Sequence, residues 1–435
     1  MHRAVLGHRD RVLHAGEYFR RGAVESKVNW LTTLALSTTL VLSTLVCSVA
    51  SAQDASHLPL RGFTRADLAL LAPYLDRGPV MHSVFRDRQS EAPSIVMATR
   101  VNASADRVAE IIRDPRSYPQ FMPALDSIAI ESEQGTQTAY SWSWRIAVFT
   151  LGGRNVMTTY PGHPTRGHRI DVLSTGGDLG LGRMAWRVFP DGPDRCTLVL
   201  ASRVDMRDAN YLADQLASGG MAVFRSINVA LTSVMVLGTR RRAEGAPRPA
   251  GELGELERPD IDPERLMPLI ARGDLVFLEL DGDALDRVSV VGRMVANVER
   301  SREVMLDPEE FGQSLMQGAR ARVVERTEDH VDFDWEIPLP LVGVDGRMRL
   351  IPSDSVVRVE GVSGGLRSGR WAFDTHRRWN DEAVAIGWAR FDPRETSRLI
   401  RRLIADDDDF AHGLAMATQI MVVRSLRLRV SRVGT

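Results

Sequence analysis

The stretch Arg100-Val-Asn-Ala-Ser-Ala-Asp-Arg-Val-Ala-Glu-Ile-Ile-Arg-Asp-Pro115 occurs twice in the chain, the second time in diverged form. Its second version lies 193 residues further on, aligned without a gap, as Arg293-Met-Val-Ala-Asn-Val-Glu-Arg-Ser-Arg-Glu-Val-Met-Leu-Asp-Pro308. Later matches keep the same order, and their separation falls to 187: Trp142-Ser-Trp-Arg-Ile146 with Phe333-Asp-Trp-Glu-Ile337, and Gly182-Arg183 with Gly369-Arg370. Short deletions in loops shrink the separation in this way. The chain is therefore an internal duplication.

The duplication determines the domain organisation that we predict for the 435 residues. We expect a first domain at 60–243 and a second at 257–435, because two domains suit a chain of this length. The segment 244–256 is rich in proline and glycine and is expected to be the linker. Upstream of the repeated stretch, Arg77-Gly78 matches Arg272-Gly273, which extends each repeat into a short helical lead-in.

Each repeat shows the same order of predicted elements. A strand at 94–102 comes first, and a short helix follows, capped by Ser104 or, in the second repeat, by Asn297. After that helix, apolar and polar residues alternate, with glycine, proline and aspartate at the breaks. This pattern predicts six strands, near 126–134, 138–147, 154–161, 168–175, 182–190 and 197–205. A long helix ends each repeat, from about Arg394 to Val430 in the second.

This order of elements resembles the START-like (SRPBCC) superfamily, of the polyketide cyclase and coenzyme Q-binding type. The segment from Val101 through Asp114-Pro-Arg-Ser-Tyr-Pro-Gln-Phe-Met-Pro123 is similar to the opening signature of that superfamily. The resemblance implies an α+β fold of two tandem helix-grip domains, each a curved antiparallel sheet wrapped around its long C-terminal helix. In the second copy Phe311-Gly-Gln-Ser314 replaces Tyr118-Pro-Gln-Phe121, which leaves open whether both copies bind the same ligand.

In the helix-grip fold the space between sheet and helix is commonly a ligand cavity, and strand parity selects the side chains that face it. The predicted ligand-binding residues are aromatic or long apolar side chains: Tyr118, Phe121, Trp142, Trp144, Met184, Trp186, Phe311, Phe333, Trp335, Trp371 and Phe373. Arg183 and Arg370 have the opposite parity and are expected on the outer face. The alternative is that the aromatic side chains simply fill a solid core.

The N-terminal segment 1–52 is typical of a signal peptide. Basic residues outnumber acidic ones before Trp30, an uncharged stretch follows, and Ala50-Ser51-Ala52 forms a small-x-small cleavage signal. We therefore predict export, to the periplasm or beyond. The uncharged stretch approaches the length of a membrane span, so an uncleaved anchor stays open.

The sequence argues against several chemistries. A formal net charge of -1 implies no strong attraction to nucleic acid, and no spacing typical of a metal site occurs. Gly361-Val-Ser-Gly-Gly365 satisfies a nucleophile motif, but it is expected to be a hairpin turn because a further strand follows it. The run Asp406–Asp409 is expected to be a solvated helix face. We predict no catalytic residue, no metal and no cofactor.

These observations favour an exported protein that binds or transfers a hydrophobic small molecule or lipid, of isoprenoid, quinone or polyketide-like type. Two alternatives stay open. One is an aromatase/cyclase-like enzyme, for which Tyr118 and Tyr140 are the candidate groups. The other is a protein-interaction module with filled cores. Transient membrane contact is compatible with the first role, and the oligomeric state is not predicted.

Overall fold

The computed structural model describes residues 60–84, 94–122, 125–146, 149–178, 180–205, 221–245, 254–315, 318–339, 342–353, 356–377, 382–404 and 407–432. The predicted signal peptide at 1–52 lies outside the described residues. Within the described ranges, no helix combines the length and the apolar character that a membrane span requires.

The first half of the described chain contains eight strands. Its elements are α2 (Arg65–Leu75), β1 (Val80–Val84), β2 (Ile95–Val101), α3 (Ala105–Arg113), η1 (Pro115–Gln120), β3 (Leu125–Gln134), β4 (Gln137–Ile146), β5 (Phe149–Thr159), β6 (His168–Gly177), β7 (Leu181–Pro190), β8 (Cys196–Asp205) and α5 (Met221–Glu244). The strand predicted at 94–102 is present as β2, and the six strands predicted after it are present as β3 to β8.

The second half repeats this order. Its elements are α6 (Met267–Ile270), β9 (Gly273–Asp281), β10 (Ala284–Arg293), α7 (Val298–Met305), α8 (Pro308–Leu315), β11 (Arg320–Arg326), β12 (Val331–Leu339), β13 (Val342–Ile351), β14 (Val356–Gly364), β15 (Arg370–Arg377), β16 (Ala383–Arg390), η3 (Pro393–Glu395), α9 (Arg398–Ile404) and α10 (Asp408–Arg432). The single helix predicted from about Arg394 is therefore wrong in its start. The side chain of Asp407 accepts a hydrogen bond from the Phe410 backbone N–H at 3.0 Å and begins α10 as a separate helix.

Side-chain caps begin the short helix of each half, as the sequence pattern indicates. The Ser104 hydroxyl accepts from the backbone N–H of Arg107 at 3.2 Å, and the Asn297 amide oxygen accepts from that of Arg300 at 2.9 Å. These contacts satisfy an N–H group that has no partner inside the helix. Pro115 then begins η1, because its ring fixes φ and suits a first helical position.

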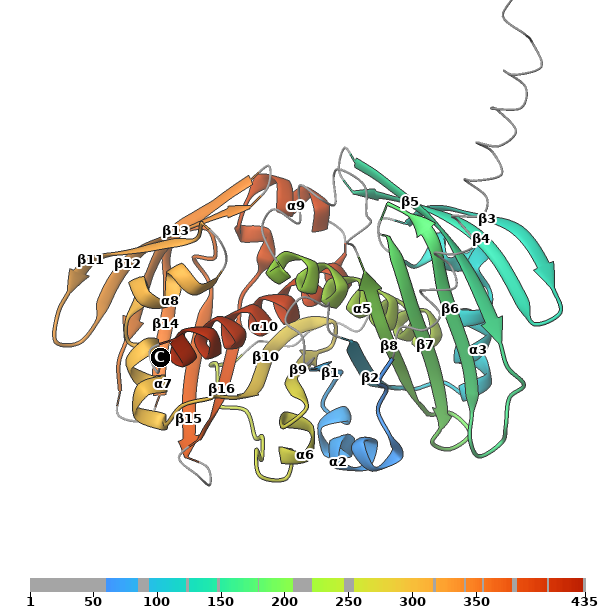
Figure 1. The fold of residues 1–435 in the computed structure, drawn as a ribbon, viewed down its shortest axis with the longest axis horizontal. Helices are drawn as coiled ribbons and strands as arrows, with labels where there is room; N and C mark the ends of the chain where they lie inside the picture. Colours follow the sequence, from blue (N-terminus) through green and yellow to red (C-terminus); the bar gives the residue numbers. More distant parts are fainter. Residues whose placement is uncertain are drawn as a thin grey trace, which may run out of the picture. The chain divides into compact units, whose positions relative to one another are not determined.

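The described strands form one antiparallel sheet in the order β11-β12-β13-β14-β15-β16-β10-β9-β1-β2-β8-β7-β6-β5-β4-β3. Figure 1 shows β9 and β1 side by side in the middle of this sheet, with the strands of each half extending away from them. The helical lead-in predicted before each repeat is present as α2 and α6. The strands β1 and β9 that follow these helices have no counterpart among the predicted elements, and they join the two halves.

Two matched glycines allow β1 and β9 to meet. A Cβ atom on Gly78 would lie 2.0 Å from the carbonyl oxygen of Leu278, and one on Gly273 would lie 2.3 Å from that of Ser83. Both distances are far shorter than any contact a carbon atom can make. Met81 pairs with Val276, and the register runs symmetrically to either side of that pair. We call this pairing of β1 with β9 the seam between the halves. The match between Arg77-Gly78 and Arg272-Gly273 follows from it, because each copy needs a glycine where the opposite strand lies closest.

The two long helices pack on one face of the sheet and on each other. Helix α5 contacts β2 and β8, and α10 contacts β9, β10 and β16. Gly413 lets them approach closely, since a Cβ there would lie 3.1 Å from the Cα of Ala230. Nearby, the Ser233 hydroxyl donates to the sulfur of Met416 at 3.6 Å. A second apolar cluster lies on the other face, where Leu71 of α2 and Leu269 of α6 pack against Phe277 of β9.

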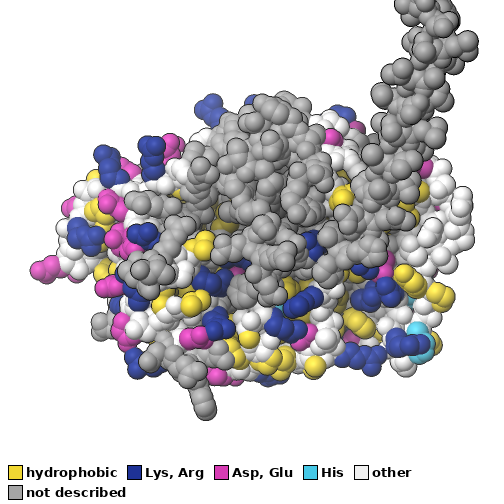
Figure 2. All heavy atoms as spheres, in the orientation of Figure 1, with side chains coloured by type: hydrophobic (Ala, Val, Ile, Leu, Met, Phe, Trp, Pro, Cys, Tyr) yellow, Lys and Arg dark blue, Asp and Glu magenta, His cyan; other side chains and the backbone are white. Residues whose placement is uncertain are grey.

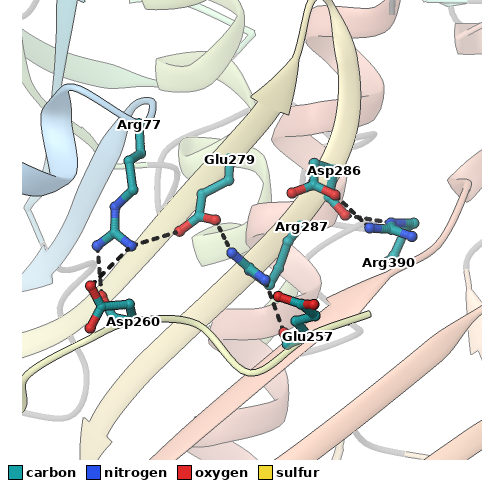
Figure 3. A network of polar contacts seen from close by, with 7 residues as sticks. All are labelled: Arg77, Glu257, Asp260, Glu279, Asp286, Arg287 and Arg390. Carbon is teal, nitrogen blue, oxygen red and sulfur yellow. Dashed lines mark hydrogen bonds and ion pairs between the residues drawn. The ribbon is translucent and has the colours of Figure 1, made fainter. Parts of the chain in front are cut away.

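An ion-pair network holds the segment after the predicted linker against the seam (Figure 3). The Glu279 carboxylate pairs with Arg77 at 3.8 Å and with Arg287. The same two guanidinium groups donate to backbone oxygens, Arg77 to that of Asp260 at 2.7 Å and Arg287 to that of Glu257 at 2.9 Å. Because Arg77 belongs to the first half and Glu279 to the second, this network links the halves.

The described surface carries charges of both signs. Figure 2 shows basic and acidic side chains interspersed over the face that it draws, with apolar side chains between them. Some of these charges pair across neighbouring strands, as Arg145 does with Asp126 at 3.0 Å and Arg322 with Asp334 at 3.3 Å. The mixture agrees with the formal net charge of -1, and exposed pairs of this kind add little to stability.

Candidate ligand-binding site

A cavity of about 110 Å³ lies inside the first half, between α5 and the inner face of the sheet. Its apolar wall comes from η1, from strands β3, β4, β7 and β8, and from α5. The apolar side chains that line it include Met122, Leu125, Ile128, Trp142, Trp144, Leu181, Met184, Val204, Leu231 and Met235. The sheet curves around α5 without bringing side chains into contact everywhere, and the cavity is the space that remains.

The two tryptophans of β4 form one wall of the cavity. Their ring centroids are 6.5 Å apart and the planes stand at 85°, an edge-to-face arrangement that aromatic pairs favour. Trp142 lies opposite Gly153 in the sheet, and a Cβ on that glycine would lie 2.5 Å from the indole ring. Gly153 therefore gives the Trp142 ring the space to lie against the neighbouring strand.

A short chain of hydrogen bonds lies on the helix side of the cavity. The Thr232 hydroxyl donates to the backbone oxygen of Asn228 at 2.7 Å. The Ser202 hydroxyl oxygen lies 2.5 Å from the Thr232 hydroxyl oxygen and 3.2 Å from the side-chain amide of Asn228. All three side chains line the cavity, and each is at most 3% exposed. The site therefore contains neutral polar groups in a largely apolar wall, and the basic residues Arg183 and Arg203 line it as well.

Two buried tyrosines also line the cavity. The Tyr118 hydroxyl donates to the backbone oxygen of Ile112, and the Tyr140 hydroxyl accepts from the Asn155 amide at 3.2 Å. Burial raises the pKa of Tyr140 to about 12 and raises the pKa of Tyr118 well above its ordinary value. Both hydroxyls are therefore protonated at neutral pH.

The structure brings four of the residues predicted for the first half to the cavity: Tyr118, Trp142, Trp144 and Met184. Trp186 lies instead within the packed core and is 1% exposed. Phe121 contacts the Tyr118 ring edge-on at 5.8 Å, while Arg242 lies 5.9 Å from its ring centre. The expectation that Arg183 lies on the outer face is wrong, because this residue borders the cavity and is half-buried.

The residues predicted for the second half lie in a packed interior. Phe333, Trp335 and Trp371 are buried in the main apolar cluster, and Phe373 packs against it. Trp371 stacks on Phe391, with ring centroids 5.4 Å apart and planes inclined by 25°. The side chain of Phe311 lies outside the described residues.

Sequence reasoning missed the polar residues Ser202, Asn228 and Thr232. A signal was available on the helix, because Asn228 and Thr232 are four residues apart and therefore share the helix face that also carries apolar side chains. Ser202 gave no comparable signal, because its position in a strand does not show which residue of another element it contacts. Its role depends on which residue of α5 lies opposite.

Three further expectations concern sites outside the cavity. Gly361–Gly365 lies at the end of β14 and in the turn to β15, as predicted. The expectation of a solvated face for the aspartate run is wrong at Asp409, which is 7% exposed and pairs with Arg241 of α5 at 2.9 Å. In the described residues, Glu325, His330 and Asp332 lie close enough to share a metal ion, but Asp332 already binds Arg349 at 2.7 and 2.8 Å.

The fold and the cavity together define a START-like helix-grip protein with two tandem copies. Residues 92–225 match the family described as "Polyketide cyclase / dehydrase and lipid transport". The match lies within the first repeat, and it confirms the resemblance stated from the sequence. The second repeat has the same fold, strand for strand. A search of curated proteins found no match.

Several solved structures are similar to the chain. The Zhui aromatase/cyclase from a Streptomyces species is 20% identical with a TM-score of 0.30, over 35% of this chain and 93% of that one. The di-domain ARO/CYC StfQ from the steffimycin biosynthetic pathway is 11% identical with a TM-score of 0.28, over 78% of this chain and 99% of that one. A STAR-related lipid transfer protein from Xanthomonas axonopodis is 14% identical with a TM-score of 0.27, over 38% and 99%. Likenesses at this level carry no inference about the ligand.

Proposed function

We propose that the first repeat binds a hydrophobic molecule and carries it, outside the cytoplasm, without converting it. The observation that carries this proposal is the cavity walled by Trp142, Trp144 and Met184 beneath α5. Removing apolar area from water drives binding in such a place, at about 25 cal/mol per Å². The family that matches this repeat, described by both cyclase chemistry and lipid transport, supports a ligand at this position.

The size of the cavity limits the class of ligand. Its volume of about 110 Å³ is below the ~300 Å³ at which ordinary small-molecule pockets begin. A molecule of one small ring, or the ring end of a longer isoprenoid or lipid, fits this volume better than an entire acyl chain does. The edge-to-face tryptophans favour the same class, because flat rings stack well against indole.

The state of the two tyrosines supports binding over conversion. Tyr118 uses its proton in the bond to Ile112, and both hydroxyls have a raised pKa, so neither is a base at neutral pH. A cyclase-like activity is the second candidate, and Tyr140 is the residue that favours it, since it lines the cavity beside Asn155. Conversion of a bound ketone that is lost in Tyr140→Phe would establish that alternative.

Filling the cavity from within tests the carrier proposal. In Met184→Trp the indole should occupy the space, as Trp371 does at the matched position of the second repeat. The hydrocarbon benzene should bind the unmodified protein and bind Met184→Trp at least about tenfold more weakly, by fluorescence titration of the cavity tryptophans. Val362→Trp is the control, because it adds the same side chain at a position that is 46% exposed. Equal binding by all three proteins, with folding confirmed by circular dichroism, would refute the proposal.

Export is part of the same proposal and rests on the signal-peptide pattern of residues 1–52. The N-terminus of the protein purified from the envelope of its own cells should begin near Gln53. An N-terminus at Met1 in a membrane fraction would indicate the uncleaved anchor, and the intact chain in the cytoplasm would contradict export.

A further inference from the structure

We propose that three polar side chains of the sheet, Tyr140, Asn155 and Ser174, bind an oxygen atom carried by the ring of the ligand. This inference rests on the proposed binding function and names the residues that make the site select an oxygen-bearing ring. The three residues, which we call the polar row, all line the cavity. Tyr140 and Asn155 are buried, at 3% and 8% exposure.

The sheet register places the polar row on one face. Strands β4, β5 and β6 are neighbours in the sheet (Figure 1). Tyr140 of β4 lies opposite Asn155 of β5, and Asn155 lies opposite Ser174 of β6. Side chains of residues directly opposite each other share a face of the sheet. The polar row is therefore a strip of polar atoms that crosses three strands in the sheet wall of the cavity.

The hydrogen bond inside the polar row leaves donors over, whichever way the Asn155 amide is turned. This amide lies 3.2 Å from the Tyr140 hydroxyl oxygen. If the amide donates, the hydroxyl proton and the second amide proton remain, and if the amide accepts, both of its own protons remain. Burial raises the pKa of Tyr140 to about 12, so the hydroxyl keeps its proton at neutral pH.

Neither Tyr140 nor Asn155 makes a second side-chain hydrogen bond within the part of the chain that the structure describes. Ser174 donates to the backbone oxygen of Gly180 at 3.3 Å, so its hydroxyl oxygen remains able to accept. A buried donor without an acceptor is costly, and a ligand oxygen in the adjoining cavity would remove that cost. The polar row can therefore both donate to and accept from a ligand.

Arginine side chains also border the cavity, and the second half separates their role from that of the polar row. Arg183 and Arg203 lie opposite each other in the sheet, and neither is without a partner. Their counterparts at the separation of 187 residues, Arg370 and Arg390, lie opposite each other as well. Arg390 pairs there with Asp286. Because the half with the stacked rings keeps both arginines, their presence does not depend on the cavity.

The polar row, in contrast, is replaced in the second half. Trp142 lies opposite Gly153 and Trp335 lies opposite Gly346, and a Cβ on either glycine would lie 2.5 or 3.0 Å from the indole. This shared contact matches Trp142 in space to Trp335, at the separation of 193 found for the repeated stretch. The residues that then take the place of the polar row, and that also lie opposite one another, are Phe333, Met348 and Gly361.

The experiment compares phenol with toluene, which have the same shape and differ in a hydroxyl or a methyl group. The double variant Tyr140→Phe/Asn155→Leu should bind phenol about tenfold more weakly than the unmodified protein does, the worth of one buried hydrogen bond. It should bind toluene equally well, because the new side chains keep the volume of the site. Replacing both partners by apolar groups of the same shape costs little stability. Isothermal titration calorimetry measures all four affinities.

Asn228→Leu is the matched control, because it removes the carboxamide that lines the cavity from α5 and leaves the polar row intact. It should leave the ratio of phenol to toluene affinity unchanged. Phenol binding that is lost in Asn228→Leu and kept in the double variant would overturn the assignment to the polar row. Phenol binding kept by both variants would overturn it too and would indicate the arginines.

Two results distinguish this inference from the binding function on which it rests. Equal losses of phenol and toluene affinity in the double variant would overturn the selection of an oxygen and leave the binding function intact. Failure of the unmodified protein to bind either compound would count against both proposals.

Discussion

The two halves of this protein share every strand and the long helix, but they differ in the side chains that lie beneath that helix. At the separation of 187 residues, Met184 and Val204 of the first half correspond to Trp371 and Phe391 of the second. The first pair lines the cavity, and the second pair stacks ring on ring. Gly369 accommodates the larger ring, since a Cβ there would lie 2.1 Å from the Trp371 indole.

At these two positions the half with the cavity has smaller side chains than the half with the stacked rings. The backbone plan is the same, so the fold by itself does not assign a ligand to either copy. A filled interior is stabilised by dispersion contacts between its side chains and excludes water. A cavity lacks those contacts but leaves space for a ligand. The two halves are joined through the shared sheet and the contact of α5 with α10.

The largest expected effect on stability comes from replacing two buried aromatic rings of the second half with smaller side chains. Trp371→Met combined with Phe391→Val removes two stacked rings that are 6% and 5% exposed. The double variant should lose about 4 kcal/mol of unfolding free energy, because buried large-to-small changes leave cavities. Urea denaturation measures this loss, and titration with benzene should reveal a second binding site. A loss below about 1 kcal/mol would show that these rings do not fill a packed interior.

The seam between the halves should be nearly as sensitive. Gly273→Ala and Gly78→Ala each place a carbon atom against a carbonyl oxygen of the opposite strand, so each should cost about 2 to 3 kcal/mol. Similar losses at both glycines would show that the seam is symmetrical. Gly62→Ala is the control, because its new Cβ would meet no neighbouring atom within 4 Å, and it should change stability little. Unchanged stability in Gly273→Ala would mean that β1 and β9 do not pair in solution.

The smallest effect on stability is expected from a buried charged residue of the second half that has no counterpart in the first. Asp409 at the start of α10 is buried beside Arg241, and its matched position 222 is an alanine. Burial raises the pKa of Asp409 to about 7, an effect that Arg241 opposes and Asp407 reinforces. The folded state therefore favours the protonated carboxyl. Its contribution to stability is complete below about pH 4, falls as the pH rises towards 7, and is constant above that value.

Asp409→Asn tests this sign, because the amide stays neutral at every pH. The variant and the parent protein should have equal stability near pH 4, and the variant should be the more stable one at pH 8, where the parent must bury a charged carboxylate. Thermal unfolding across that range measures the difference. A variant that becomes less stable than the parent as the pH rises would show that the ion pair with Arg241 outweighs the cost of burying the charge.

Much of the cavity wall followed from the sequence. The period of two placed Trp142 and Trp144 on one face of a strand, and the structure has both at the cavity. The same rule selected Trp186, which lies in the packed core two positions beyond Met184. Parity states which face a side chain takes. It does not state at which residues of the strand the sheet moves away from the helix. Side chains at those residues line the cavity, and side chains where the sheet and helix lie closer are packed in the core.

The amino-acid sequence alone determined the duplication, the strands within each copy and the family resemblance, because residue period, caps and turn residues act over a few neighbouring positions. Only the tertiary structure decided that β1 and β9 join the copies in one sheet, that Asn228 meets Ser202, and that Asp409 is buried. Each of these contacts depends on which segment, far away in the sequence, lies opposite the residue in space. No local sequence pattern specifies that pairing. A cavity likewise exists only when the volumes of side chains from several strands and a helix are compared in space.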